Sequence, residues 1–473
     1  MLHILASFRG PRRAQLPCLS LSTRAENVSP AARHSLYICR LFGYSKKEIK
    51  ARDAYPIVTA KRNGDFATKR LLSLTLALAL ALTVFAACGK DDSSSAASSG
   101  GGSSAPLATA TPQPTPAPFD GQPLTGEEKG AGYVGGRPVA VMINNRSDSR
   151  PTRGLSQADV LYEIMVEGGI TRFMALFPNA NFSEIGPVRS GRDQFFRLIR
   201  PYQALYLFVG RSEITQQYID DTGYGELAVN GMKVSFAYRD PVREAQGWTT
   251  DATAYTNGEK IQSYIQSNNI DMSRELSSPI FDFVDYRESP RALGGESATS
   301  VNIVHSSSYR TAFDYDAASG KYLTSLYAPK SGYTPMVDEA TGGRMAFENV
   351  IVLFTDITQY PYPGGNPHGN PDYKKVDYDF GGLGYYISNG RIEKIRWTKG
   401  PTDYPLMLQD EAGNSLKVNC GKSYVAVVSL NEYDNFSYEG DGGDATANSV
   451  AVDPNADSAA QQAEQAADAA DAS

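Results

Sequence analysis

The fold is decided by one stretch of the sequence, Asp159-Val160-Leu161-Tyr162-Glu163-Ile164-Met165-Val166-Glu167-Gly168-Gly169-Ile170-Thr171-Arg172-Phe173-Met174-Ala175-Leu176-Phe177. Two apolar runs of strand length flank a glycine pair, which predicts an antiparallel hairpin with the two-residue turn Gly168-Gly169. In that register Met165 faces Arg172 and Glu163 faces Met174. Arg172 then lies diagonal to Glu163 and Glu167 on one face of the ribbon. The opposite, core-facing side takes Tyr162, Ile164, Val166 and Phe173.

Two carboxylates beside one guanidinium group permit two interpretations. Glu163 and Glu167 could be the acid/base pair of a catalytic site. They could also form cross-strand ion pairs with Arg172 that shield a sheet edge, an arrangement that needs no ligand and is the commoner one. The sequence leaves both interpretations open.

Mixed strand and helix signals surround this hairpin and predict an α/β domain over residues 125–290. Apolar runs at 137–143 and 204–209 are typical of buried strands, and residues 258–266 are typical of a helix. Residues 190–199 predict a further helix, in which Ser190 and Asp193 have the spacing of a capping box.

From residue 296 to residue 435 the signals are strands alone, separated by turn residues such as Asn389-Gly390. They predict a smaller antiparallel all-β domain, either a sheet or a small sandwich. The fold class is therefore α+β, with an N-terminal mixed α/β domain, this β domain, and a disordered tether and tail. The expected strands are 301–305, 313–315, 322–326, 350–355, 384–387, 392–397, 416–418 and 424–428.

Cys88 closes an apolar run, residues 71–87, that follows Lys69 and Arg70. The basic start, the apolar run and the small residues before the cysteine predict a signal peptide over residues 68–87 with lipidation at Cys88, as in a bacterial lipobox. An uncleaved transmembrane anchor is the alternative. Either anchor places the bulk of the chain on the extracytoplasmic face of the cell membrane.

The other segments outside the two domains differ in composition. Residues 1–67 are interpreted as a non-native or unstructured extension, with the true start of translation near Lys69. Residues 88–124 are rich in Ser, Gly, Thr and Pro, which predicts a flexible tether. Residues 436–473 combine many alanines with acidic residues, which predicts a disordered tail.

Charge and residue counts argue against several classes of function. From Cys88 onward the chain has 31 Lys and Arg against 48 Asp and Glu, a formal net charge of −17. Such an acidic chain is a poor candidate for nucleic-acid binding. Cys420, His305 and His368 are the only other cysteine and histidines in that part, so neither a disulfide framework nor a metal site is expected. No cofactor is expected either, because no Walker loop or dinucleotide fingerprint occurs.

A Gly/Pro-bent loop, Gly186-Pro187-Val188-Arg189-Ser190-Gly191-Arg192-Asp193, leads into the predicted helix. Free N–H groups at a helix start favour an anion, and Arg189 and Arg192 add donors suited to carboxylate or phosphate. In the alternative interpretation, Ser190 and Asp193 only cap the helix while the arginines pair with Glu163, Glu167 or Asp240. The loop 144–151 follows a predicted strand, where ligands commonly bind, although its residues also describe an ordinary turn.

In order along the chain, these segments resemble the YerB-type lipoproteins of Gram-positive bacteria, a family with N-terminal and C-terminal domains of unassigned function. One triplet departs from the expected pattern: an acidic-His-Thr sequence is expected before Tyr255-Thr256, and this chain has Asp251-Ala252-Thr253. The resemblance implies an envelope lipoprotein and supplies no reaction. It covers residues of about 130 to 432 and rests on 137–145, 154–159, 162–163, 167–173, 185–193, 239–240 and 255–256, with weaker matches at 389–390, 397 and 421–422.

We expect the α/β domain to bind an anionic or glycan-type envelope ligand, or a partner protein, at the start of the predicted helix. One alternative is a cell-wall-acting hydrolase that uses Glu163 or Glu167 as general acid/base, with Arg189 and Arg192 holding the scissile group. Another is an envelope scaffold or regulator without a small-molecule site. Carboxylates facing each other across an open cleft would favour catalysis, and carboxylates clamped by arginines would favour structure. The expected ligand-binding residues are Asn144, Asn145, Arg150, Arg172, Arg189, Ser190, Arg192, Asp193 and Asp240.

Overall fold

The computed structural model describes residues 119–234, 236–361 and 372–440. Cys88, the predicted signal peptide, and most of the predicted tether and tail lie outside these residues. Within the described ranges, no helix is both long enough and apolar enough to cross a membrane.

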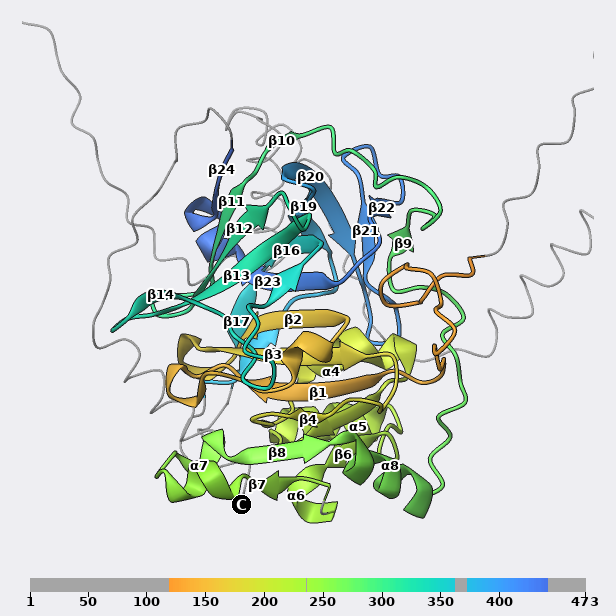
Figure 1. Cartoon of the computed structure of the whole chain (residues 1–473), viewed down its shortest axis with the longest axis vertical. Helices are drawn as coiled ribbons and strands as arrows, with labels where there is room; N and C mark the ends of the chain where they lie inside the picture. Colours follow the sequence, from red (N-terminus) through yellow and green to blue (C-terminus); the bar gives the residue numbers. More distant parts are fainter. Residues whose placement is uncertain (1–118, 235, 362–371, 441–473) are drawn as a thin grey trace, which may run out of the picture. The chain divides into compact units, whose positions relative to one another are not determined.

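A mixed sheet, eleven-stranded among the described residues, contains strands from both predicted domains (Figure 1). In that figure, orange to light green marks the first half of the described chain and green to blue marks the second. Across the sheet the order is β10 (Glu296–Ser297), β20 (Arg391–Thr398), β19 (Gly382–Ser388), β16 (Asn349–Thr355), β23 (Ser423–Ser429), β2 (Val160–Met165), β3 (Thr171–Phe177), β1 (Val139–Asn144), β5 (Leu205–Phe208) and β6 (Ala228–Asn230), with β21 (Met407–Gln409) paired to β20.

In the main sheet one parallel pairing, that of β2 with β23, joins the two halves of the chain. Strand β23 lies between β2 and β16 and runs parallel to both, so that Val425 is opposite Tyr162 on one side and Ile351 on the other. All seven residues of β23 are buried, as expected for a central strand covered on both faces. The prediction that residues 296–435 form a purely antiparallel sheet of their own is therefore wrong. An apolar run in the sequence predicts a strand but does not indicate which other strand it pairs with.

A second sheet, antiparallel throughout, packs on one face of the first. The rings of Phe313 and Phe347 in this second sheet meet the ring of Tyr424 in β23 edge to face. One of its strands, β24, lies inside the predicted tail 436–473, so ordered structure continues to Glu439. Among the described residues its strands are β14 (Gly332–Pro335), β13 (Lys321–Ala328), β12 (Arg310–Asp316), β11 (Ser300–Val304) and β24 (Ser437–Glu439), with β15 (Ala346–Phe347) beside β13.

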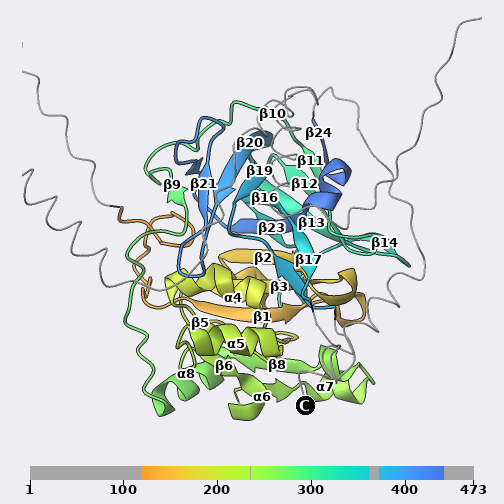
Figure 2. The same ribbon diagram turned by 180° about the vertical axis from the view of Figure 1, so that it is seen from behind.

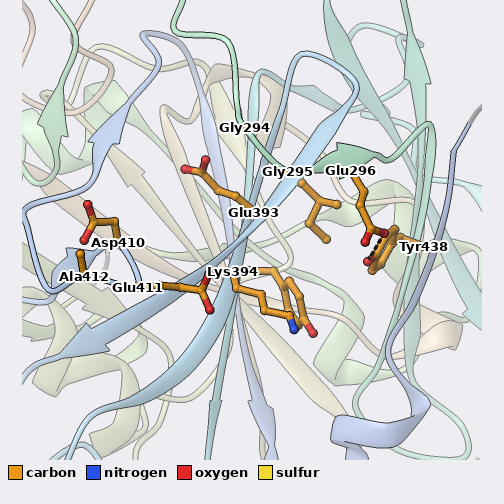
Figure 3. A pocket seen from close by; sticks show the side chains of 11 residues that line it. Gly294, Gly295, Glu296, Glu393, Lys394, Asp410, Glu411, Ala412 and Tyr438 are labelled. Atoms are coloured by element: carbon orange, nitrogen blue, oxygen red, sulfur yellow. Dashed lines mark hydrogen bonds between the residues drawn. The ribbon is translucent and has the colours of Figure 1, made fainter.

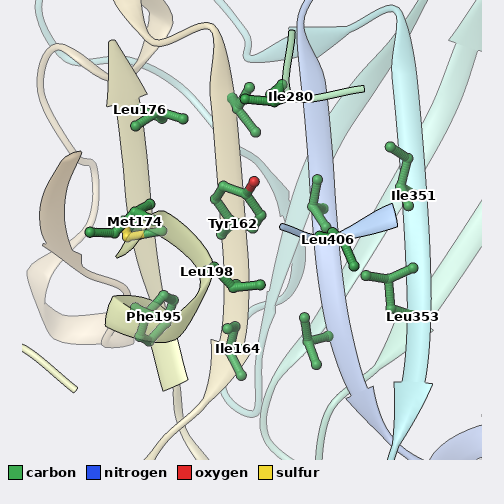
Figure 4. Close-up of a cluster of buried hydrophobic side chains, with 14 of the residues drawn as sticks. Tyr162, Ile164, Met174, Leu176, Phe195, Leu198, Ile280, Ile351, Leu353 and Leu406 are labelled. Carbon is green, nitrogen blue, oxygen red and sulfur yellow. The ribbon is translucent and has the colours of Figure 1, made fainter. Parts of the chain in front are cut away.

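Helix α4 (Asp193–Ile199) covers the other face of the main sheet, and all seven of its residues are buried. Figure 4 shows Phe195 and Leu198 of this helix against Tyr162 and Ile164 of β2. The helix begins three residues later than predicted. Arg192 occupies the N-cap position without a capping hydrogen bond from its side chain, so the predicted capping box of Ser190 and Asp193 is wrong.

The remaining elements lie around these two sheets. Figure 2 shows α4 and α5 on the same side of the lower strands, and the two helices are in contact. The helices are α5 (Glu213–Asp221), α6 (Gly231–Val234), α7 (Pro241–Ala245) and α8 (Gly258–Ser267). The short ribbons are β4 (Glu184–Ile185) with β8 (Ala254–Asn257) and β7 (Tyr238–Arg239), β17 (Ile357–Gln359) with β18 (Lys374–Val376), and β9 (Asp282–Phe283) with β22 (Lys417–Val418).

The hairpin that decides the fold forms, but it is one residue out of the predicted register. Ile164 is opposite Arg172 and Glu163 is opposite Phe173. The turn holds three residues, Glu167–Gly169, because the N–H of Val166 donates to the carbonyl of Ile170. Since side chains alternate along a strand, this shift places Glu163 and Arg172 on opposite faces. The predicted diagonal contact between them is wrong.

Candidate functional site

The candidate site lies at the carboxyl end of β1. Strands β1 and β5 pair in parallel up to Val141 and Leu207. Beyond these residues the backbone of Arg189 lies between the two strands. Its N–H donates to the carbonyl of Met142 at 3.0 Å, and its carbonyl accepts from the N–H of Val209 at 3.0 Å. The carboxyl edge of neighbouring parallel strands is a common place for ligands in α/β sheets.

Two buried arginines share one carboxylate at this edge. Nη1 of Arg146 lies 3.1 Å from Oδ2 of Asp251, and Nη1 of Arg189 lies 3.1 Å from Oδ1. Arg146 also donates to both carboxylate oxygens of Asp148, at 3.1 and 2.7 Å. The arginine side chains are 1% and 6% exposed, whereas those of Asp251 and Asp148 are 24% and 32% exposed. Water therefore reaches the carboxylates of this outer arginine cluster (Arg146, Arg189, Asp148 and Asp251).

Asn144, the last residue of β1, positions the outer arginine cluster through its hydrogen bonds. Its side-chain N–H₂ donates to Oγ of Ser149 at 2.9 Å and to the carbonyl of Asp251 at 3.1 Å, while its Oδ1 accepts from the N–H of Arg146 at 3.0 Å. One buried amide thus ties the 3₁₀ turn Ser147–Ser149 to the 3₁₀ turn Thr250–Ala252. Both Arg146 and Asp251 are held in place through it.

An inner arginine cluster surrounds Glu167 in the hairpin turn. Nε and Nη2 of Arg192 donate to its two carboxylate oxygens at 2.6 and 3.3 Å, and Nη2 of Arg172 lies 3.7 Å away. All three side chains are at most 1% exposed. Arg172 also donates to the carbonyl of Ser190 at 2.8 Å. A carboxylate so deeply buried needs hydrogen-bond donors of this kind to replace the water it loses.

Glu163 lies on the other face of the hairpin and accepts hydrogen bonds from five side chains. Burial alone would raise the pKa of Glu163, but the imidazole of His305 and the hydrogen bonds lower it to about 2. At neutral pH this carboxyl is ionised, so it lacks the proton that a general acid must deliver. The donors are Thr171 at 2.7 Å and Asn145 at 3.2 Å on Oε1, and Thr311 at 2.7 Å, His305 Nε2 at 2.9 Å and Tyr424 on Oε2.

Arg150 connects this region to the second sheet. Its Nε and Nη2 donate to Oδ1 and to the carbonyl of Asn145, at 3.1 and 2.9 Å. Its Nη1 donates to the carbonyl of Tyr327 in β13 at 3.0 Å, and the guanidinium carbon lies 5.6 Å from the centre of the Tyr309 ring. Loop 144–151 is therefore held by both halves of the chain.

Two of the expected ligand-binding residues have other contacts. Oδ2 of Asp193 accepts a hydrogen bond from Tyr360 at 2.6 Å, and burial raises the pKa of Asp193 to about 6. Asp240 accepts from the N–H of Val242 at 2.9 Å at the start of α7, and it lies 3.2 Å from Arg153. Asp193 therefore anchors the β17–β18 ribbon, and Asp240 caps a helix.

The structure brings Asn144 and Arg189 together at the outer arginine cluster, with Arg189 four residues before the start of α4, and places Arg192 of the inner arginine cluster at the N-cap of that helix. Anion binding there stays a prediction. Both carboxylates proposed for catalysis are clamped by buried donors, which is the arrangement expected of structural residues. Two groups of residues were not among the expected site residues. Arg146 and Asp251 could have been found, since they lie in the loop 144–151 and in the departing triplet 251–253. Thr311 and Tyr424 carry no local signal.

Other hollows on the described surface are lined by different residues. Figure 3 shows one, with a volume of about 470 Å³, in which carboxylates outnumber the one lysine, Lys394. Two of its acidic groups are engaged: Tyr438 donates to Glu296 at 2.8 Å, and Arg291 donates to Glu393 at 3.1 Å. Within residues 119–234, 236–361 and 372–440, no three His, Cys, Asp or Glu side chains gather in a way that could hold a metal ion.

Comparisons with known proteins agree with the layout of the chain. Residues 124–271 match the family described as "Protein of unknown function (DUF3048) N-terminal domain", and residues 300–425 match its C-terminal domain. The Bacillus subtilis (strain 168) protein named "Putative lipoprotein YerB" is 24% identical over 280 residues, which are 58% of this chain and 77% of that protein. The crystal structure of YerB from Bacillus subtilis shares the fold, with a TM-score of 0.54 and 23% identity, covering 65% of this chain and 96% of that one.

Proposed function

The chain belongs to the two-domain YerB-type family of unassigned function, and on that premise we propose that it is a lipid-anchored, extracytoplasmic protein that binds an anionic group at the outer arginine cluster. The group is a carboxylate or a phosphate, such as those on envelope glycans. The protein acts as a binding module and catalyses no reaction in this proposal, because the carboxylates that hydrolysis would need are held by buried donors.

One observation carries the proposal: Arg146 and Arg189 aim at the same carboxylate, and that carboxylate is a quarter exposed. Guanidinium groups hold carboxylate and phosphate through paired, directional hydrogen bonds. Asn144 fixes the geometry in advance, which reduces the entropy lost on binding. An anionic group that displaces the side chain of Asp251 would find both donors already in place.

Titration of the full chain with two small anions tests this site. Inorganic phosphate and N-acetylmuramic acid are the probes, and N-acetylglucosamine is the uncharged control sugar. The variant Arg146→Gln/Arg189→Gln is expected to bind the anions at least about tenfold more weakly, as lost charge-assisted hydrogen bonds predict. Arg287→Gln is the matched control, since that arginine is 51% exposed and pairs with Asp285.

The substitution Asp251→Asn gives a result of opposite sign. It removes the internal competitor and leaves both arginines, so the affinity for phosphate should rise. Unchanged affinity in both the double arginine variant and Asp251→Asn would contradict the site. Thermal unfolding of each variant separates lost binding from lost folding.

The lipid anchor is tested at Cys88. Mass spectrometry of protein from the membrane fraction should find an acylated cysteine as the first residue, and Cys88→Ala should release the protein from membranes. Cys420→Ala is the control, because Cys420 is partly buried and hydrogen-bonds to the carbonyls of Gly126 and Val284. An unmodified thiol at Cys88 on membrane-bound protein would contradict the anchor.

A further inference from the structure

We propose that one ligand of the outer arginine cluster is the chain's own acidic segment, residues 441–473. This inference rests on the proposed function, because it names an anionic partner for the same site. In it, carboxylates of this segment bind Arg146 and Arg189 and compete with any free anionic ligand.

Charge complementarity is the first argument. Residues 441–473 contain six Asp, one Glu and no Lys or Arg. Five arginines gather around the carboxyl end of β1, where three carboxylates, those of Asp148, Glu167 and Asp251, pair with them. Arginines therefore outnumber these carboxylates at this site, in a chain whose net charge from Cys88 onward is −17. They are linked through short contacts: Asn144 is opposite Arg172 in the sheet, and Arg172 donates to Ser190, the neighbour of Arg189. The five are Arg146, Arg150, Arg172, Arg189 and Arg192.

Chemical identity is the second argument. The outer arginine cluster already holds two aspartate carboxylates, those of Asp148 and Asp251. The acidic segment offers the same functional group on side chains of the same length. Its small neighbouring residues, mostly Ala, Gly and Ser, would not obstruct an approach to a partly exposed site.

Reach is the third argument. The described chain runs through Glu439, which pairs with Ser300 at the first residue of β11. The other end of β11 leads to His305, which contacts Glu163, and Glu163 contacts Asn145 beside Arg150. Five strand residues span roughly 17 Å, whereas the 33 residues of the acidic segment could extend over about 110 Å. The segment can therefore reach the cluster without movement of any described element.

Tethering makes even a weak contact effective. A segment joined to its own binding site by a short linker has an effective concentration on the order of millimolar. Free anions must then compete with it, and a ligand with several anionic groups would displace it best. The site would thus be selective for multivalent anionic ligands.

Two reagents test this proposal with the full chain. In a neutral-tail variant, the seven acidic residues of 441–473 are replaced by Asn or Gln. A fluorescent peptide with the native sequence 441–473 should bind this variant at low ionic strength, and a peptide with the same seven replacements should not.

Introducing Arg146→Gln/Arg189→Gln into the neutral-tail variant should weaken peptide binding at least about tenfold, whereas introducing Arg287→Gln should not. The neutral-tail variant should also bind inorganic phosphate about threefold more tightly than the unaltered chain.

The outcomes separate the two proposals. If the peptide does not bind at concentrations up to about the millimolar level that tethering supplies, or binds the double arginine variant equally well, the acidic segment is not the ligand. Phosphate binding that still depends on Arg146 and Arg189 would then preserve the proposed function alone. Absence of phosphate binding in every form would overturn both. If the double arginine variant fails to fold, Asp251→Asn replaces it and is expected to bind the peptide more tightly; unchanged peptide binding would overturn the proposal.

Discussion

Glu163 is the residue at which the two halves of the chain depend on one another. Asn145 and Thr171 donate to it from the first half, and His305, Thr311 and Tyr424 donate to it from the second. These donors replace the water that a buried carboxylate loses. Their full engagement explains why Glu163 is a structural group despite its appearance as a catalytic candidate in the sequence.

Replacement of this carboxylate should be costly. Glu163→Gln puts an N–H₂ group where one carboxylate oxygen accepts hydrogen bonds, so at least two buried donors lose their acceptor. Each donor left unsatisfied costs about 1 to 3 kcal/mol of unfolding free energy. Urea unfolding at pH 7 measures the change. Asp314→Asn is the matched control, because Asp314 is 61% exposed and pairs with Arg344; such pairs contribute about 0 to 1 kcal/mol. Equal effects of the two substitutions would contradict this account.

Lowering the pH should reduce the difference in unfolding free energy between the Glu163→Gln variant and the unaltered chain. The pKa of Glu163 is about 2 in the folded chain and 4.5 ordinarily, so its stabilising effect is complete above pH 4.5 and is lost as the pH falls through 2. Unfolding free energies measured from pH 2 to pH 6 should converge at the acidic end. A constant difference over that range would mean that the carboxylate is not the source of the stability.

At the level of elements, local sequence predicted what forms but not its alignment. The hairpin β2–β3 was expected from its two apolar runs, yet Glu167 joins Gly168 and Gly169 in the turn and moves the register by one residue. Both faces of the hairpin are buried, so alternation alone could not fix the register. Helix α4 likewise begins later than its capping residues predicted, because the backbone of 187–191 is bound between β1 and β5.

The carboxyl group of Asp193, the first residue of α4, should make the free energy of unfolding depend on pH. Folding raises the pKa of Asp193 from 3.8 to about 6, so the folded chain binds its proton more tightly than the unfolded chain does. Stability should therefore fall as the pH rises from about 4 to about 6, by an amount on the order of 2 kcal/mol from this group.

Asp193→Asn tests that dependence, since the amide does not titrate. Unfolding free energies between pH 4 and pH 7 should show a shallower decline in this variant. Some decline should remain, because burial also raises the pKa of Asp159 to about 6. An unchanged slope would show that Asp193 has no part in it.

For the molecule as a whole, the feature that could not be predicted from the sequence is the sheet shared by both halves of the chain. The expected strands of the second half form, and so do those of the first. The pairing of β2 with β23, however, joins residues more than 250 positions apart, and no local pattern encodes it. The candidate site shows the same limit: the expected set included Asn144, Arg150, Arg172, Arg189 and Arg192. It missed Asp251, which pairs with Arg189, and Arg146, the second arginine on that carboxylate.

One continuous sheet predicts one cooperative unfolding transition. In Trp248→Phe, the buried Trp397 is the only tryptophan and reports on the second half, while circular dichroism reports on both halves. The two signals should change at the same urea concentration. Val425→Pro in the centre of β23 should unfold both halves together, because proline removes a ladder hydrogen bond there. Separate transitions would mean that the halves are independent domains.

The most direct test of the anion site is a crystal structure of the neutral-tail chain carrying Asp251→Asn, soaked in inorganic phosphate. The predicted result is a phosphate within hydrogen-bond distance of both Arg146 and Arg189, in the place left by the carboxylate of Asp251. Guanidinium groups that keep their positions with no anion between them would contradict the account.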